Sequence, residues 1–135
     1  MASKRGLGSL AKARLALRVA RSYVRVRSRV RRQPLPAFVA ELSREASGGA
    51  EHQPPARLSR AVDRVLRVGN RQPTCLVNAL VLFELLRDQG DRAELVIGLP
   101  ASPADKDAHA WVELNGVDVG PPPGRSGHAE MARFG

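Results

Sequence analysis

The longest apolar stretch of the chain lies at residues 76–86. Nine of these eleven residues are apolar, and only Asn78 and Glu84 interrupt the run. A stretch that is apolar on nearly every side predicts a helix buried in the centre of a domain. Thr74 carries a hydroxyl that can cap the first turn, and Gly90 is typical of the position just after a last turn. The pattern therefore predicts a buried helix between these two residues.

The N-terminal part of the chain has a different pattern. Residues 7–32 contain no Pro, and arginines recur there at the helical period, which predicts one long helix with an arginine stripe. The stripe consists of Arg14, Arg18, Arg21, Arg25, Arg29 and Arg32. Apolar residues line both sides of it: Leu10, Leu17, Ala20 and Val24 on one, and Leu15, Val19, Tyr23, Val26 and Val30 on the other. Such a helix needs a partner surface.

The partner surface of this helix stays open at the level of sequence. The helix can pack on its own domain or on another protein, lie on a membrane surface, contact nucleic acid, or imitate a transit peptide. No apolar run in the chain approaches the roughly 20 residues that span a bilayer, so we expect a cytoplasmic protein.

Two shorter helices are predicted at 37–46 and 57–68, joined by a Gly- and Pro-containing linker at 47–55. The linker is the expected boundary between a basic helical N-terminal segment, residues 1–46, and a domain at residues 56–135.

The second half of the domain reads as a small sheet. Residues 93–99 and 108–114 are predicted strands, and Asn115-Gly116 is a strong hairpin signal that predicts an antiparallel return at 117–119. The Pro- and Gly-rich tail is expected to be loop, with His128 in solvent. The fold class is therefore predicted as α+β, with helices preceding an antiparallel sheet.

Charge and composition narrow the function classes. The chain carries a net charge of +9, but residues 1–40 hold eleven bases and no acid, whereas the remainder holds 11 bases and 13 acids. The excess positive charge thus belongs to the N-terminal segment, and with only 4% aromatic residues we expect no nucleic-acid partner for the domain. A single Cys excludes an internal disulfide and cysteine-rich metal clusters, and no metal or other cofactor is expected.

That single Cys occupies a chemically favourable position. Cys75 falls in the first turn of the predicted buried helix, where free backbone amides and the helix dipole stabilise a thiolate. His109 lies at the start of a predicted strand, within Ala-His-Ala-Trp. A Cys on a central helix and a His on an adjacent strand form an arrangement in which the imidazole can take the thiol proton.

The segments around these two residues resemble a known family. They read Pro73-Thr74-Cys75-Leu76-Val77, Leu95-Val96-Ile97-Gly98 and Ala108-His109-Ala110-Trp111-Val112-Glu113-Leu114. In this order they are similar to the leader peptidases of lasso-peptide biosynthesis. The resemblance covers residues 57–120 and implies a papain/transglutaminase-like core, in which a buried helix carries the Cys and an antiparallel sheet carries the His.

The resemblance also implies an activity and partners. The enzyme would hydrolyse the bond between the leader and the core of a ribosomally made precursor peptide. A separate leader-recognition protein would deliver the precursor, because a chain of 135 residues has no room for that domain as well. The lasso cyclase is a further candidate partner, and the basic N-terminal helix a candidate for peripheral membrane contact. Two alternatives stay open: another thiol acyltransferase on the same fold, and a non-catalytic module that binds the precursor or a membrane.

The remaining members of the expected site are an oxyanion donor, a residue beside the cleft and a third catalytic residue. Asn70 and Gln72 are candidates for an oxyanion donor beside the Cys75 amide, and Trp111 can wall the substrate cleft or belong to the core. The family places an Asp after a Gly like Gly120, but Pro121 occupies that place here.

The nearest acid, Asp118, is therefore the expected third catalytic residue. A two-residue turn would pair it with Glu113, about 13 Å along the strand from His109. Glu113, Glu130 or a backbone carbonyl are the alternatives for orienting the imidazole.

Overall fold

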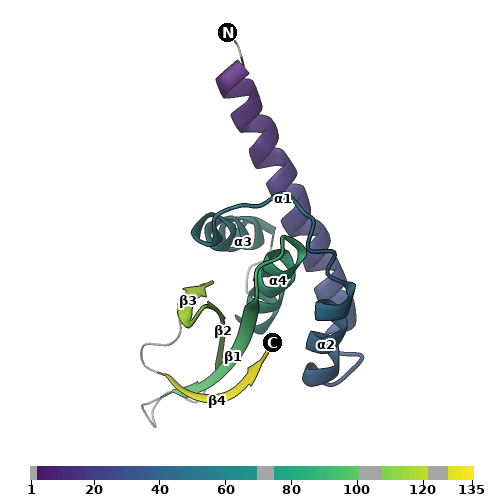
Figure 1. The fold of residues 1–135 in the computed structure, drawn as a ribbon, viewed down its shortest axis with the longest axis vertical. Coiled ribbons are helices and arrows are strands. Elements are labelled where there is room, and N and C mark those ends of the chain that lie inside the picture. Colours follow the sequence, from purple (N-terminus) through teal and green to yellow (C-terminus); the bar gives the residue numbers. More distant parts are fainter. Residues whose placement is uncertain (1–2, 70–74, 101–107, 122–127) are drawn as a thin grey trace.

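Helix α4, Cys75–Asp88, occupies the centre of the fold, with three helices and a four-stranded sheet around it (Figure 1). The structure is a computed structural model, and it describes residues 3–69, 75–100, 108–121 and 128–135. The other elements are α1 (Ser3–Arg29), α2 (Leu35–Glu45), α3 (Pro55–Gly69), β1 (Ala93–Pro100), β2 (His109–Leu114), β3 (Val117–Gly120) and β4 (His128–Phe134). The described residues therefore form an α+β fold, in which four helices are followed by an antiparallel sheet.

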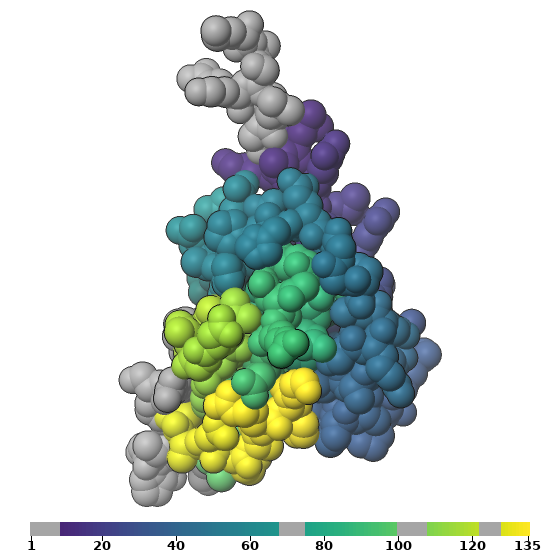
Figure 2. Space-filling view, in the orientation of Figure 1, coloured from purple at the N-terminus to yellow at the C-terminus, as the bar shows by residue number. Residues whose placement is uncertain are grey.

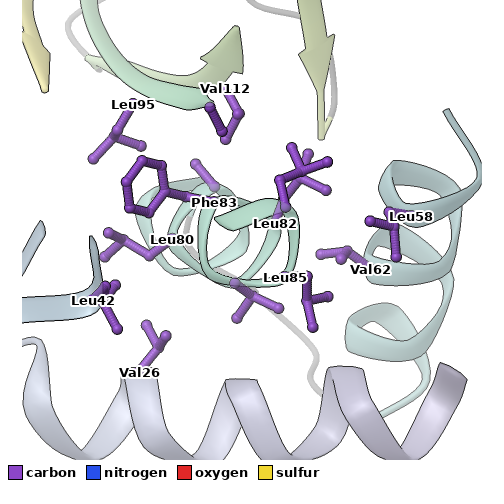
Figure 3. Packing of buried hydrophobic residues seen from close by; sticks show 14 of the residues in the cluster. Val26, Leu42, Leu58, Val62, Leu80, Leu82, Phe83, Leu85, Leu95 and Val112 are labelled. Carbon is purple, nitrogen blue, oxygen red and sulfur yellow. The ribbon is translucent and has the colours of Figure 1, made fainter. Parts of the chain in front are cut away.

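The apolar composition of α4 explains its central position. Nine consecutive residues, from Asn78 to Leu86, are buried. Figure 3 shows the reason, because α4 contacts α1 through Val26, α3 through Val62, and the sheet through Leu95 and Val112. Burying each large apolar side chain contributes about 1.5–3 kcal/mol, so a helix with apolar residues on all sides is most stable when every side has a partner. The prediction of a buried central helix is confirmed.

Helix α1 packs on the domain through one of its two apolar flanks. Leu15, Val19 and Val26 are at most 6% exposed and belong to the common core. The other flank faces away, and its members Leu10, Leu17 and Val24 are 57%, 53% and 65% exposed.

Part of the arginine stripe is paired within the molecule. The Arg25 guanidinium contacts the Glu84 carboxylate at 2.7 Å, and Arg29 contacts Glu41 and Glu45, each at 3.2 Å. Arg18 donates to the Glu51 carbonyl at 3.3 Å. These contacts help to hold α1 on the rest of the chain. Of the partner surfaces considered for this helix, the structure therefore shows packing on its own domain. None of the helices in the described ranges has the length and apolar character needed to cross a membrane.

The predicted linker at 47–55 is fastened to the C-terminal end of α4. The Gln89 side-chain amide donates to the Gln53 carbonyl at 2.8 Å, and the Gln53 amide donates to Gln89 Oε1 at 3.0 Å. The Ala50 amide donates to the Asp88 carbonyl at 2.9 Å. The linker therefore joins two segments whose buried side chains share one core, which includes Phe38 of α2 and Leu58 of α3.

The sheet has the order β3-β2-β1-β4, and all of its pairings are antiparallel. Leu114 pairs with Val117 across the turn, so Asn115 and Gly116 form a two-residue loop. Both residues have positive φ, 53° and 78°, which is the conformation that favours Asn-Gly in such hairpins. The predicted hairpin is confirmed.

The expectation that the tail is loop was wrong. Residues His128–Phe134 form β4, which pairs with β1 and makes β1 an interior strand. The tail segment has the composition His-Ala-Glu-Met-Ala-Arg-Phe, which lacks β-branched residues and carries little local strand signal. Without β4, strand β1 would expose unpaired amides and carbonyls along the edge that does not face β2. Pairing with these groups explains why the tail adopts a strand conformation.

Candidate active site

Cys75 is the first residue of α4, at the helix end where backbone amides have no intrahelical acceptor. Its side chain is partly exposed, and Sγ lies 3.8 Å from the carbonyl oxygen of Ala108. Ala108 directly precedes β2, so this contact joins segments 33 residues apart. The structure thus brings the thiol to the start of the strand that carries His109.

His109 begins β2, opposite Gly98 of β1. Its ring is half-buried and stacks on Trp111, with centroids 6.0 Å apart and an interplanar angle of 24°. Both side chains lie on one face of the strand because the two positions are two residues apart. The indole therefore supports one side of the imidazole.

Trp111 is a buried residue, 1% exposed, and its indole N–H donates to Glu113 Oε2 at 2.9 Å. Its neighbour Val112 points to the other face of the sheet and packs on α4. The sequence left open whether Trp111 lies beside the substrate cleft or in the core. In the structure its side chain is buried and also contacts His109.

Gly98 makes the position of the indole possible. A Cβ at Gly98 would lie 2.6 Å from two carbons of the Trp111 ring and 3.0 Å from the His128 Cβ. Real side chains essentially never approach so closely, so any larger residue at this position would displace the indole. The Gly in Leu95-Val96-Ile97-Gly98 is thus explained by the close approach of Trp111 to β1.

Glu113 is tied to partners other than the imidazole. It is 2% exposed, accepts the indole N–H of Trp111, and pairs with the Arg133 guanidinium at 3.1 Å. Arg133 also pairs with Glu130 and, at 3.5 Å, with Glu94. The hydrogen bonds that Arg133 donates to the Glu130 and Glu113 carboxylates raise the pKa of the guanidinium. The two glutamates considered as orienting groups for His109 therefore both hold Arg133.

His128 was missed as a site residue, because the tail was expected to be loop and this side chain solvated. Its ring centroid lies 5.2 Å from that of His109 and 6.2 Å from that of Trp111. The sequence offers no local signal for this contact, since it depends on the pairing of β4 with β1.

Asp118 lies on β3 opposite Glu113, in the register predicted from the Asn-Gly turn. Its Oδ1 accepts the Gly120 amide at 2.8 Å. Glu113, the partner of Asp118, lies four residues after His109 on β2. The distance along the strand between these two positions is about 13 Å. The structure therefore brings Cys75 and His109 close in the fold, and places Asp118 farther along the sheet.

Several predicted features lie outside the described residues. These are the oxyanion candidates Asn70 and Gln72 and the capping residue Thr74. Within the described ranges, no three His, Cys, Asp or Glu residues are arranged to hold a metal ion.

Comparison with known protein families gives one match. The transglutaminase-like superfamily matches residues 10–133, a range that begins within α1 and ends within β4. No match was found among curated proteins or among solved structures. The family match spans nearly the whole chain and contains both Cys75 and His109. The chain therefore belongs to the transglutaminase-like superfamily.

Proposed function

We propose that this protein is a cysteine peptidase that removes the leader from a lasso-peptide precursor by thiol acyl transfer to water. Membership in the transglutaminase-like superfamily suggests a thiol-dependent hydrolase or acyltransferase. The observation that carries the proposal is the 3.8 Å contact between Cys75 Sγ and the carbonyl of Ala108, the residue before His109. The resemblance of the surrounding motifs to lasso leader peptidases supplies the substrate class.

The chemistry follows from these two side chains. His109 takes the thiol proton, and the Cys75 thiolate attacks the carbonyl carbon of the scissile peptide bond. His109 then protonates the amine of the core peptide as the carbon–nitrogen bond breaks, which leaves a thioester between the leader and Cys75. A water molecule deprotonated by His109 attacks the thioester, and the leader leaves with a free carboxylate while the thiol regains its proton.

The negative oxygen of the tetrahedral intermediates needs hydrogen-bond donors. The backbone amide of Cys75, at the N-terminal end of α4, is one proposed donor. A side-chain or backbone amide of Asn70 or Gln72 is the proposed second. Trp111 supports the imidazole from one side. Asp118 is not assigned a role in orienting His109, because about 13 Å along the strand separates its level from that of the imidazole, which is beyond hydrogen-bond reach.

Mass analysis of the cleaved leader tests the proposed reaction. The protein is incubated with the precursor and its leader-recognition protein, and we expect a leader that ends in a free carboxylate. Cys75 is the only cysteine, so alkylation with iodoacetamide has one thiol target, and loss of cleavage should follow the appearance of a single adduct. Cleavage that persists after complete alkylation would contradict the proposal.

A thiol acyltransferase is the second candidate, and the superfamily itself favours it, because transglutamination transfers an acyl group to an amine. The first half of the reaction is the same, and only the acceptor differs. If an amine added to the reaction is found joined to the leader carbonyl in place of the carboxylate, the protein is an acyltransferase. A free carboxylate in the presence of excess amine supports the peptidase.

A further inference from the structure

A groove of about 600 Å³ lies between helices α1 and α3. The space-filling view shows the surface of α3, in teal, directly beside the first half of α1, in purple (Figure 2). Of the described residues of the candidate site, Cys75, His109 and Asp118 do not line this groove. Its lining residues are Lys12, Leu15 and Ala16 of α1 together with Arg57, Arg60, Ala61, Arg64 and Val65 of α3.

The groove combines a cationic rim with an apolar floor. Four of its lining residues are exposed Lys or Arg, and none is acidic. Leu15 at the floor is 6% exposed, and Ala61 and Val65 are half-buried and pack against the core. A surface with this composition attracts a ligand that is both negatively charged and partly apolar.

The cations of this groove have no counterpart within the described part of the chain. Arg25 and Arg29, on another side of α1, are paired with Glu84, Glu41 and Glu45. By contrast, no ion pair joins Lys12, Arg57, Arg60 or Arg64 to any described carboxylate. The groove therefore concentrates positive charge that the described carboxylates do not neutralise.

The spacing of the cations indicates the shape of the ligand. Arg57, Arg60 and Arg64 are three and four residues apart, so they form a row along one side of α3. At 1.5 Å per residue this row spans about 10 Å, which is longer than one carboxylate or phosphate can contact. A second helix that carries acids at the same spacing, with apolar residues beside them, matches both the row and the floor.

We propose that the groove between α1 and α3 binds an acidic amphipathic helix of a partner polypeptide. The apolar side of that helix covers Leu15, Ala61 and Val65, and its carboxylates pair with the arginine row of α3. This docking site does not use Cys75 or His109, so the proposal stands or falls independently of the proposed peptidase activity.

A synthetic helix provides the test. The probe is a fluorescein-labelled peptide of about five helical turns, with Glu on one side and Leu on the other at three- and four-residue spacing. A peptide of the same composition but scrambled order is the control. Fluorescence anisotropy gives the affinity of each peptide for the full chain, at about 0.05 M and about 0.3 M salt, because screening weakens contacts between exposed charges. We expect the amphipathic peptide to bind more tightly than the scrambled one.

Three variants locate the binding. Arg60→Glu/Arg64→Glu should weaken binding of the probe by about tenfold or more, because two attractions become repulsions. The matched control Arg31→Glu/Arg32→Glu changes the net charge equally at exposed positions outside the groove, and should change affinity by less than about twofold. Ala61→Lys adds positive charge but fills the apolar floor, so it should also weaken binding. Circular dichroism melting curves verify that each variant is folded.

Other results would overturn the proposal. Equal losses in the two charge-reversal variants would show non-specific attraction to a basic protein. Tighter binding by Ala61→Lys would show that charge alone is responsible. Binding of phosphatidylglycerol vesicles that depends on Arg60 and Arg64, without binding of the peptide, would assign the groove to an anionic membrane instead.

Discussion

Replacing Glu84 with Gln should make the protein more stable at pH 8, and the gain should shrink as the pH falls toward 4.5. Glu84 lies in the middle of α4 and is 3% exposed. Its Oε1 contacts Arg25 at 2.7 Å, whereas Oε2 is buried and accepts no hydrogen bond from any described residue. Burial disfavours the charged form more than Arg25 favours it, and the pKa of Glu84 is raised from 4.5 to about 7.

The sign and size of the effect follow from this shift. Between pH 4.5 and 7 the folded protein keeps a proton on Glu84 that the unfolded chain releases. The contribution of the neutral Glu84 carboxyl to the free energy of unfolding is therefore fully present below pH 4.5. It is lost as the pH rises through 7. At about 1.4 kcal/mol per pKa unit, the loss amounts to roughly 3 kcal/mol. Gln has the same shape and no charge to bury, so it avoids this loss.

Unfolding followed by circular dichroism tests this reasoning. Free energies of unfolding of the wild type and of Glu84→Gln are measured in urea from pH 4.5 to pH 8. At pH 8 the variant should be more stable by roughly 3 kcal/mol, which corresponds to about 10 °C in Tm for a chain of this size. Glu45→Gln is the matched control, because the Glu45 side chain is 45% exposed and its pair with Arg29 contributes at most about 1 kcal/mol. Curves for the wild type and Glu84→Gln that stay parallel over this range would refute the account.

Three further substitutions test the sheet and the site. Gly98→Ala places a methyl group 2.6 Å from the Trp111 ring and should destabilise the fold by about 1–3 kcal/mol, so an unchanged urea midpoint would contradict the close approach. Trp111→Phe removes the N–H that Glu113 accepts at 2.9 Å and should cost about 1–2 kcal/mol in urea unfolding; wild-type stability would show that this hydrogen bond is dispensable. Asp118→Asn should leave the turnover of precursor cleavage near the wild-type rate, because about 13 Å along the strand separates the level of Asp118 from that of His109; a loss of orders of magnitude would show that Asp118 orients the imidazole.

Local patterns in the sequence were sufficient for the elements that depend on local physics. The run at 76–86 predicts a buried helix because its apolar side chains leave no side for solvent. Asn115-Gly116 predicts the hairpin because both residues tolerate positive φ. The position of Cys75 at the start of α4 follows in the same way from the pattern of the helix itself.

Features that depend on distant segments were not predictable. Strand β4 has little strand propensity of its own and forms along the edge of β1, about 30 residues earlier in the chain. The contact of His128 with His109 depends on that pairing, so it was missed as well. The arginine stripe was visible in the sequence, but its partner Glu84 lies 59 residues from Arg25, and only the packed helices bring them together.

The rate of precursor cleavage by Cys75→Ala tests the central claim most directly. The substitution removes only the Sγ atom that lies 3.8 Å from the Ala108 carbonyl, and precursor binding, measured in parallel, should be retained. The proposed mechanism predicts that cleavage falls to the uncatalysed level while binding is unchanged, because no other thiol is present in the chain. Cleavage by Cys75→Ala at the wild-type rate would contradict thiol catalysis by this protein.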